Sequence, residues 1–152
     1  MLMSFDAVLF DLDGVLTKTA VVHAAAWKRL FDEYLQARAT ATRSPFRPFD
    51  ELLDYRRYVD GKLRQDGVKS FLESRGIVLP LGTPQDGPDR ETIHGLGNKK
   101  DGYFQAQLKA HGVAVYDDAV HCLRTLRARG VRTAVVSASK HTAAVVERVG
   151  LA

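Results

Sequence analysis

Two carboxylates stand at the end of a short apolar run near the start of the chain. The run Ala7–Phe10 predicts a strand buried on both faces, as in a parallel sheet, and Asp11, Asp13 and Gly14 follow it. Side chains two residues apart on an extended chain point the same way, so both carboxylates should project from one face. Open α/β sheets bind ligands at this C-terminal end of their strands. The alternative is a strand that simply ends in a polar turn, where Asp and Gly are common.

Hydroxyl groups follow a second β-rich run. Val131–Val136 precedes the segment Ser137-Ala138-Ser139-Lys140. A hydroxyl at Ser137 and the free N–H groups of a following helix start would make an anion cradle, to which Ser139 and Lys140 could add donors. The alternative is that Ser137 to Ser139 only cap a helix. Together with the paired carboxylates, the segment favours a binding site for an anion over a simple helix cap.

The rest of the chain reads mainly as helices. Apolar spacing predicts helices over residues 18–39, 50–60, 64–74, 89–94, 103–110, 117–129 and 141–149. Pro45 and Pro48 mark a loop, residues 77–88 form another, and the glycine-rich segment 95–102 should interrupt a helix. The order of elements is therefore strand, long helical insert, helix, strand, helix.

This order predicts an α/β fold in which the two strands pair in parallel through a crossover. Residues 1–17 and 113–152 should form an incomplete Rossmann-like core, and residues 18–112 should form an inserted, all-helical cap domain. The insert carries its own apolar faces and should pack as a separate lid.

Composition narrows the classes of partner. The chain has 152 residues, 45% hydrophobic and 26% charged, with a net charge of +4. It has no compact Lys/Arg run and no apolar stretch of about 20 residues, so neither nucleic acid nor a membrane is an expected partner. Cys122 is the single cysteine, which excludes an intrachain disulfide and fits a reducing cytoplasm. A phosphorylated small molecule suits the excess of cations.

The stretch from the apolar run through Asp11-Leu-Asp13-Gly14-Val-Leu-Thr17 resembles the first motif of the haloacid dehalogenase superfamily of phosphotransferases and phosphatases. A carboxylate at a strand tip can attack phosphorus in line, provided that a cation such as Mg²⁺ offsets the repulsion. The resemblance implies that Asp11 is nucleophile and metal ligand. It further implies that Asp13 is the general acid/base, with its backbone carbonyl on the metal, and that Ser137 is the phosphate-binding second motif.

The helical insert narrows the resemblance. Thr19, His23 with Trp27, Gly61-Lys-Leu-Arg64 and Asn98-Lys99-Lys100-Asp101 resemble the cap of β-phosphoglucomutases. The resemblance implies that Thr19 and His23 lie beside the acid/base aspartate and that Arg64 grips the substrate's distal phosphate. Arg suits this role because it can hold an anion in a bidentate manner.

Some positions within the insert leave alternatives open. Lys99 is a weaker match than Arg64, and Asp60 stands before Gly61 where the resemblance implies a lysine. His23 could instead satisfy a packed helix face, and Arg64 could be an exposed helix charge.

Two further motifs of the superfamily, a lysine and an acidic pair, have no counterpart in this sequence. We therefore expect the chain to correspond to the N-terminal portion of such an enzyme, to be weakly active or inactive alone, and to self-associate through an open sheet edge. Three functions remain open: hexose phosphate interconversion, hydrolysis of small phosphate esters by a phosphatase, or a non-catalytic phosphate-binding or assembly module completed by a partner chain.

Overall fold

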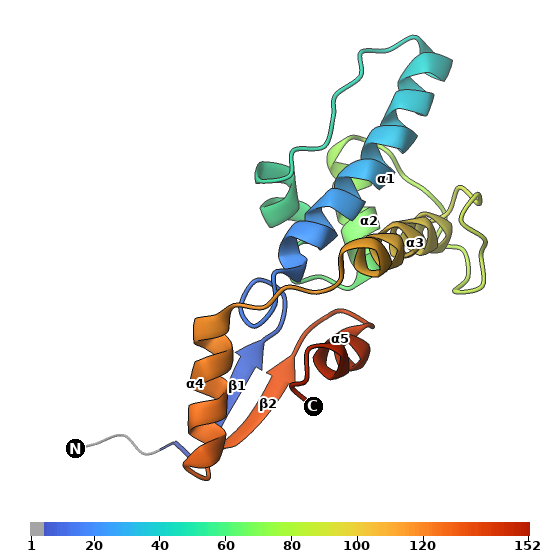
Figure 1. The fold of residues 1–152 in the computed structure, drawn as a ribbon. Coiled ribbons are helices and arrows are strands. Elements are labelled where there is room, and N and C mark those ends of the chain that lie inside the picture. The colour runs from blue at the N-terminus through green and yellow to red at the C-terminus, as the bar shows by residue number, and fades with distance from the viewer. Residues whose placement is uncertain (1–4) are drawn as a thin grey trace. The chain divides into compact units, whose positions relative to one another are not determined.

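The structure, a computed structural model, describes residues 5–152. Its chain groups into two compact units: the segment that ends at Val21 together with Gly112–Ala152, and the continuous segment Val22–His111. The residues of each unit can be followed in Figure 1 by their colour, which runs along the chain by residue number.

The first unit is an α/β unit built on two parallel strands. Strand β1 (Ala7–Asp11) pairs with β2 (Arg132–Val136) in a register that sets Ala7 opposite Arg132 and Asp11 opposite Val136. Helix α4 (Asp117–Ala128) is the crossover between them, and α5 (Thr142–Arg148) follows β2 (Figure 1). The predicted α/β class and parallel pairing are confirmed.

The strands are covered on one face only, which corrects the prediction of a strand buried on both faces. Exposed and half-buried residues alternate along both strands. The half-buried face contacts α4: Nε of Arg127 on this helix donates a hydrogen bond of 2.9 Å to the hydroxyl of Thr133 on β2. On the other face Leu9 is 69% exposed and Val136 is 57% exposed, because no helix of the described chain buries them.

A short ladder joins the two segments that lead out of the first unit. The N–H of Lys18 donates to the carbonyl of Ala114 at 2.8 Å, and that of Tyr116 donates to the carbonyl of Leu16 at 3.0 Å. Thr17 and Val115 form the antiparallel bridge between them. The spacing of apolar residues gave no indication of this pairing, because it depends on segments nearly 100 residues apart.

The second unit is helical. It contains most of α1 (Thr19–Thr42), the π-helical turn η1 (Tyr55–Val59), α2 (Arg64–Ser74) and α3 (Ile93–His111). Tilted aromatic rings pack together in its core: the centroid of Phe31 lies 4.1 Å from that of Phe71 and 5.2 Å from that of Phe49. Within residues 5–152 no helix is both long and apolar enough to span a membrane.

Helix α3 corrects a second prediction. Residues 89–94 and 103–110 are not two helices separated by a glycine-rich break, because Ile93–His111 is one continuous helix. The glycines make room for neighbours: a Cβ at Gly95 would lie 2.2 Å from the carbonyl oxygen of Arg90, and one at Gly97 would lie 3.3 Å from Nε of Arg64. A side chain at either position would crowd these neighbours, so glycine is required there despite its usual cost of about 1 kcal/mol in a helix interior.

Candidate functional site

The ends of the two strands bring together three of the predicted site residues. The hydroxyl of Ser137 donates a hydrogen bond of 2.8 Å to Oδ2 of Asp13, and the hydroxyl of Thr19 donates one of 2.5 Å to Oδ1. Thr19 is buried and Asp13 is half-buried. Both oxygens of one carboxylate are therefore held in place by hydroxyl donors from different segments.

Asp11 lies at the tip of β1, opposite Val136 in the register. Its side chain is exposed, and its Oδ1 accepts the backbone N–H of Leu12 at 2.7 Å. The turn that follows requires Gly14, whose φ is +85° and whose added Cβ would lie 3.3 Å from that of Ala20. The resulting geometry leaves the Asp11 carboxylate accessible at the strand tip.

A buried hydroxyl pair supports the Asp13 carboxylate. Oγ1 of Thr17 lies 2.7 Å from Oγ1 of Thr19 and 3.1 Å from the carbonyl oxygen of Leu12. Both threonines are almost completely buried. Sequence reasoning missed Thr17 as a site residue; the Thr-x-Thr spacing beside the carboxylates is the signal that could have identified it.

The segment after β2 is a tight turn held by serine hydroxyls. Oγ of Ser137 accepts the N–H of Ser139 at 3.0 Å, and Oγ of Ser139 accepts the N–H of His141 at 3.2 Å. Ala138 and Lys140 are exposed. The N-cap residue of α5 is His141, and no side chain caps the helix. Ser137 is therefore not the helix cap, and its hydroxyl hydrogen points to Asp13 instead.

In the second unit, the side chain of Arg64, the first residue of α2, is held by residues of α3. Its NH2 group donates to Oδ1 of Asn98 at 3.1 Å, and its NH1 group lies 2.9 Å from Oδ1 of Asp101. NH1 is buried and donates no hydrogen bond within the described chain, so the contact with Asp101 is an ion pair rather than a well-aligned hydrogen bond. The Arg64 side chain is 25% exposed, which argues against a freely solvated helix charge.

His23 lies in a buried aromatic and cationic cluster of the same unit. Its ring stacks on Phe104 with centroids 4.0 Å apart, and its Nδ1 lies 2.7 Å from Nζ of Lys100. Lys100 is 5% exposed and also sits 4.9 Å from the ring centroids of Trp27 and Phe104. An ammonium group only donates, so Nδ1 accepts and the ring proton of neutral His23 is placed on Nε2.

The lysine of this segment that reaches His23 is Lys100, which sequence reasoning did not single out. Lys99 lies 3.6 Å from Glu33 in a surface ion pair. Neighbouring residues on a helix point about 100° apart, so Lys99 and Lys100 on α3 reach different partners.

The family follows from the whole sequence. Residues 5–152 match the family of haloacid dehalogenase-like hydrolases. The chain belongs to this family.

Curated relatives narrow the comparison. A β-phosphoglucomutase of Mycobacterium bovis is 49% identical over 145 residues, which cover 95% of this chain and 55% of the relative. An uncharacterized glycosyl hydrolase of Mycobacterium tuberculosis is 39% identical over 147 residues, which make up 11% of that protein. The chain thus spans about half the length of the β-phosphoglucomutase that it matches.

Solved structures agree on the fold. A β-phosphoglucomutase from Clostridium difficile superposes with a TM-score of 0.67 at 19% identity, covering 98% of this chain and 58% of that one. A haloacid dehalogenase family hydrolase from Deinococcus radiodurans, with bound phosphate and sodium, superposes with a TM-score of 0.54 at 30% identity. The match covers 97% of this chain and 53% of that one.

Within this haloacid dehalogenase-like chain, Asp11 and Asp13 are the residues that suit a hard cation. Mg²⁺ prefers carboxylate and carbonyl oxygens and usually keeps several waters, so two donors from one strand end fit part of its coordination sphere. In residues 5–152 no cluster of three or more His, Cys, Asp or Glu side chains could hold a metal ion. The donor set described here is thus compatible with Mg²⁺ but does not enclose it.

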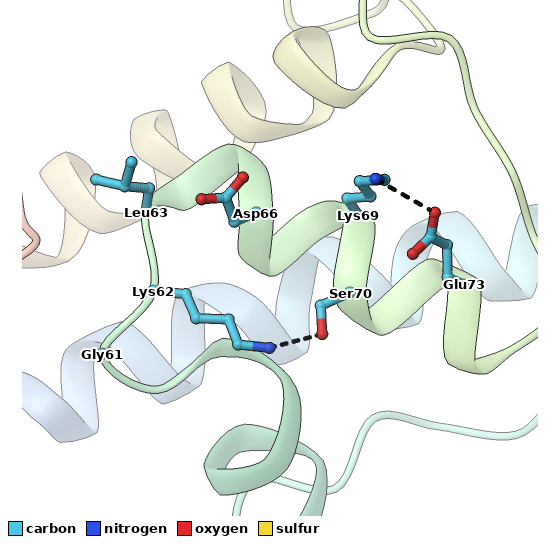
Figure 2. Close-up of a pocket in the computed structure, with 7 residues that line it drawn as sticks. All are labelled: Gly61, Lys62, Leu63, Asp66, Lys69, Ser70 and Glu73. Atoms are coloured by element: carbon cyan, nitrogen blue, oxygen red, sulfur yellow. Dashed lines mark hydrogen bonds and ion pairs between the residues drawn. The ribbon is translucent and has the colours of Figure 1, made fainter.

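A surface pocket of about 640 Å³ lies elsewhere, on the second unit (Figure 2). Gly61, Lys62, Leu63, Asp66, Lys69, Ser70 and Glu73 line it. Lys62 donates to the hydroxyl of Ser70 at 2.8 Å, and Lys69 pairs with Glu73 at 3.7 Å. Its cations and carboxylates balance, and its lining includes none of the predicted site residues.

Proposed function

We propose that this chain carries the nucleophile, the acid/base and the first phosphate-binding groups of an Mg²⁺-dependent phosphotransferase that interconverts hexose phosphates, as β-phosphoglucomutases do. The observation that carries the proposal is the hydrogen bond from Ser137 to Asp13 beside the exposed Asp11 carboxylate. It joins the two strand ends at which the sequence places carboxylate and phosphate-binding chemistry.

In the proposed reaction a carboxylate oxygen of Asp11 attacks the phosphorus of a sugar phosphate. The bond between phosphorus and the sugar oxygen breaks, and Asp13 gives a proton to that oxygen, leaving an aspartyl-phosphate and a sugar hydroxyl. Asp13 then takes the proton from another sugar hydroxyl as its oxygen attacks the phosphorus and releases Asp11. Ser137, Ser139 and Lys140 would hold the phosphate oxygens.

The Asp11 carboxylate and the backbone carbonyl of Asp13 would hold Mg²⁺, which when bound offsets the repulsion between carboxylate and phosphate. Thr19 orients Asp13 through the hydrogen bond described above. His23 would offer a donor at Nε2, and Arg64 would grip the distal phosphate of a substrate that presents either end.

The 49% identity to a β-phosphoglucomutase supports the sugar phosphate as the substrate class. Because the match covers 55% of that relative, we expect the 152-residue chain to turn over weakly or not at all by itself. Removing a preorganised charge from such a site typically costs a few kcal/mol of barrier.

The phosphoenzyme step can be tested directly. The chain is incubated with Mg²⁺ and either acetyl phosphate or β-glucose 1,6-bisphosphate, quenched in acid and digested. We expect a phosphoryl group on the peptide that contains Asp11, and none in Asp11→Asn. Asp13→Asn should slow labelling by the sugar phosphate about 10²- to 10⁴-fold but spare acetyl phosphate, whose leaving group needs no proton. No label on Asp11 with either donor would contradict the proposal.

A phosphatase is the second candidate, favoured by the hydrolase description of the family and by the phosphate in the Deinococcus radiodurans structure. Arg64→Ala separates the two. It should cripple transfer from a bisphosphate and spare hydrolysis of an aryl phosphate if the chain belongs to a mutase. Equal loss on both substrates would contradict the role proposed for Arg64.

The third candidate is a phosphate-binding or assembly module completed by another chain. The exposed sheet face of Leu9 and Val136 favours it. Binding of phosphate without any label on Asp11, together with the mass of a dimer in sedimentation, would support this reading against the enzyme.

A further inference from the structure

The loop between α2 and α3 is fastened to the first turn of α3 by one carboxylate. Oδ2 of Asp86 accepts the hydroxyl of Thr92 at 2.6 Å and the N–H of Thr83 at 3.1 Å. The hydroxyl oxygen of Thr92, which is 8% exposed, accepts in turn the N–H of Gly95 at 2.9 Å. We call these contacts of Asp86, Thr92 and Gly95 the loop latch.

The latch depends on a glycine. Gly82 has φ +70°, and a Cβ there would lie 2.1 Å from Oδ2 of Asp86 and 2.5 Å from the hydroxyl of Thr92. Any larger residue would push the carboxylate and the hydroxyl apart. The loop is thus held in a defined conformation by these hydrogen bonds and by the close packing at Gly82.

Asn98 connects the latched loop to Arg64. Its Nδ2 donates to the carbonyls of Pro84 at 3.1 Å and Asp86 at 2.8 Å, while its Oδ1 accepts from NH2 of Arg64 at 3.1 Å. Carbonyls only accept and a guanidinium only donates, so these three contacts permit one orientation of the amide. A shift of the loop therefore moves the group that holds Arg64.

The guanidinium lies on a platform made by consecutive turns of α3. Gly97 leaves space for its Nε, Asn98 holds NH2, and Asp101 lies 2.9 Å from NH1. NH1 is buried and paired with Asp101, so these contacts fix the orientation of the whole guanidinium, on a side chain that remains 25% exposed.

From these contacts we infer that Asn98 is a positioning residue for Arg64, through which the loop latch sets the direction of the guanidinium toward a phosphate ester. The inference rests on the proposed function only for the identity of the anion. The coupling between the latch and Arg64 belongs to the second unit alone.

The test uses the 152-residue chain and a matched pair of variants, Thr92→Val and Thr92→Ser. Valine keeps the shape of the side chain and removes the latch hydroxyl, whereas serine keeps the hydroxyl. Two NMR readouts are taken: the Nε–Hε and Nη–Hη signals of Arg64 without ligand, and their shifts during titration with inorganic phosphate. The amide of Ser137 in the first unit serves as the internal control.

In Thr92→Val we expect the separate Nη–Hη signals of Arg64 to average and phosphate affinity at Arg64 to fall about 2- to 30-fold, the range of ordinary site coupling. Affinity at Ser137 should not change, and Thr92→Ser should behave as the wild type. Asp86→Ala, which removes the half-buried carboxylate of the latch, gives the same test if Thr92→Val unfolds.

Two results are to be distinguished. If the Arg64 signals and affinity stay unchanged while trypsin cleaves faster after Arg90, the loop is free and the inference is overturned. If Thr92→Val mobilises Arg64 but phosphate shifts it in no variant, Asn98 still positions Arg64, and it is the proposed role of Arg64 in substrate binding that fails.

Discussion

Ser137 donates its hydroxyl hydrogen to Oδ2 of Asp13 across 2.8 Å, joining residues 124 positions apart in the chain. The parallel register brings the two strand ends level, since Asp11 lies opposite Val136. The hydroxyl has a single hydrogen, so in the proposed reaction it donates either to the Asp13 carboxylate or, after turning, to the phosphate that is transferred.

Replacing Ser137 by alanine should weaken phosphate binding at the strand ends about 10- to 100-fold, because hydrogen bonds to charged groups are worth about 1.5–3 kcal/mol. Titration with inorganic phosphate, followed at the amides of residues 138–140, measures the loss. Ser44→Ala, at an exposed hydroxyl, is the control. An unchanged affinity in Ser137→Ala would remove Ser137 from the phosphate site.

Thr17→Val should lower the free energy of unfolding by about 1 kcal/mol. The loss is small because the carbonyl of Leu12 still accepts the N–H of Leu16 and the hydroxyl of Thr19 still donates to Asp13.

Thr19→Val should raise the barrier of phosphoryl transfer by more than it lowers the free energy of unfolding, since it removes a hydrogen-bond donor from Asp13. Urea unfolding of both variants and labelling of Asp11 give the comparison; an equal effect of both variants on labelling would contradict a special role for Thr19.

Lys100→Met removes the donor at Nδ1 of His23, so the ring should no longer be held in a single tautomer. The methionine keeps an apolar side chain against Trp27 and Phe104. In the wild type, long-range ¹H–¹⁵N spectra should show the Nε2–H form of the neutral ring, and in Lys100→Met a mixture of the two forms. Lys99→Met is the matched control, because Lys99 contacts Glu33 instead. A wild-type ring protonated on Nδ1 would show that Lys100 does not set the tautomer.

The loop latch should open in acid. Hydrogen bonding, first from the Thr92 hydroxyl and then from the N–H of Thr83, lowers the pKa of Asp86 below 3.8. A depressed folded-state pKa means that the latch contributes stability above pH 3.8 and loses it as the pH falls through the folded-state value. The amide shifts of Thr83 and Gly95, recorded as the pH is lowered, should report this opening. In Asp86→Asn the same shifts should no longer titrate, and a titration that persists there would assign the opening to another group.

Self-association through the exposed sheet face should depend on its apolar residues. Leu9→Lys should shift the sedimentation of the chain toward the monomer, because a charged group would have to be buried when the exposed face packs against a second copy. Leu63→Lys is the control, since Leu63 is 52% exposed but belongs to the second unit. A wild-type chain that sediments as a monomer at every concentration would contradict the expectation.

The sequence alone predicted the elements that depend on local pattern. Apolar runs identified both strands, and helical spacing identified α2 with the same bounds as the structure and α4 to within one residue at its C-terminal end. The type and spacing of Asp11, Asp13 and Ser137 pointed to one sheet edge, because the carboxyl ends of adjacent parallel strands must meet there.

Only the tertiary structure decided what fills the space around those elements. Glycine-rich sequence predicted a break in α3, yet the helix is continuous, with the nearby Arg90 occupying the space at Gly95 and the distant Arg64 occupying the space at Gly97. Likewise, the contact between Lys100 and His23 spans 77 positions and that between Arg64 and Asn98 spans 34. Periodicity reports which face of an element is apolar; it carries no information on which distant side chain lies against that face.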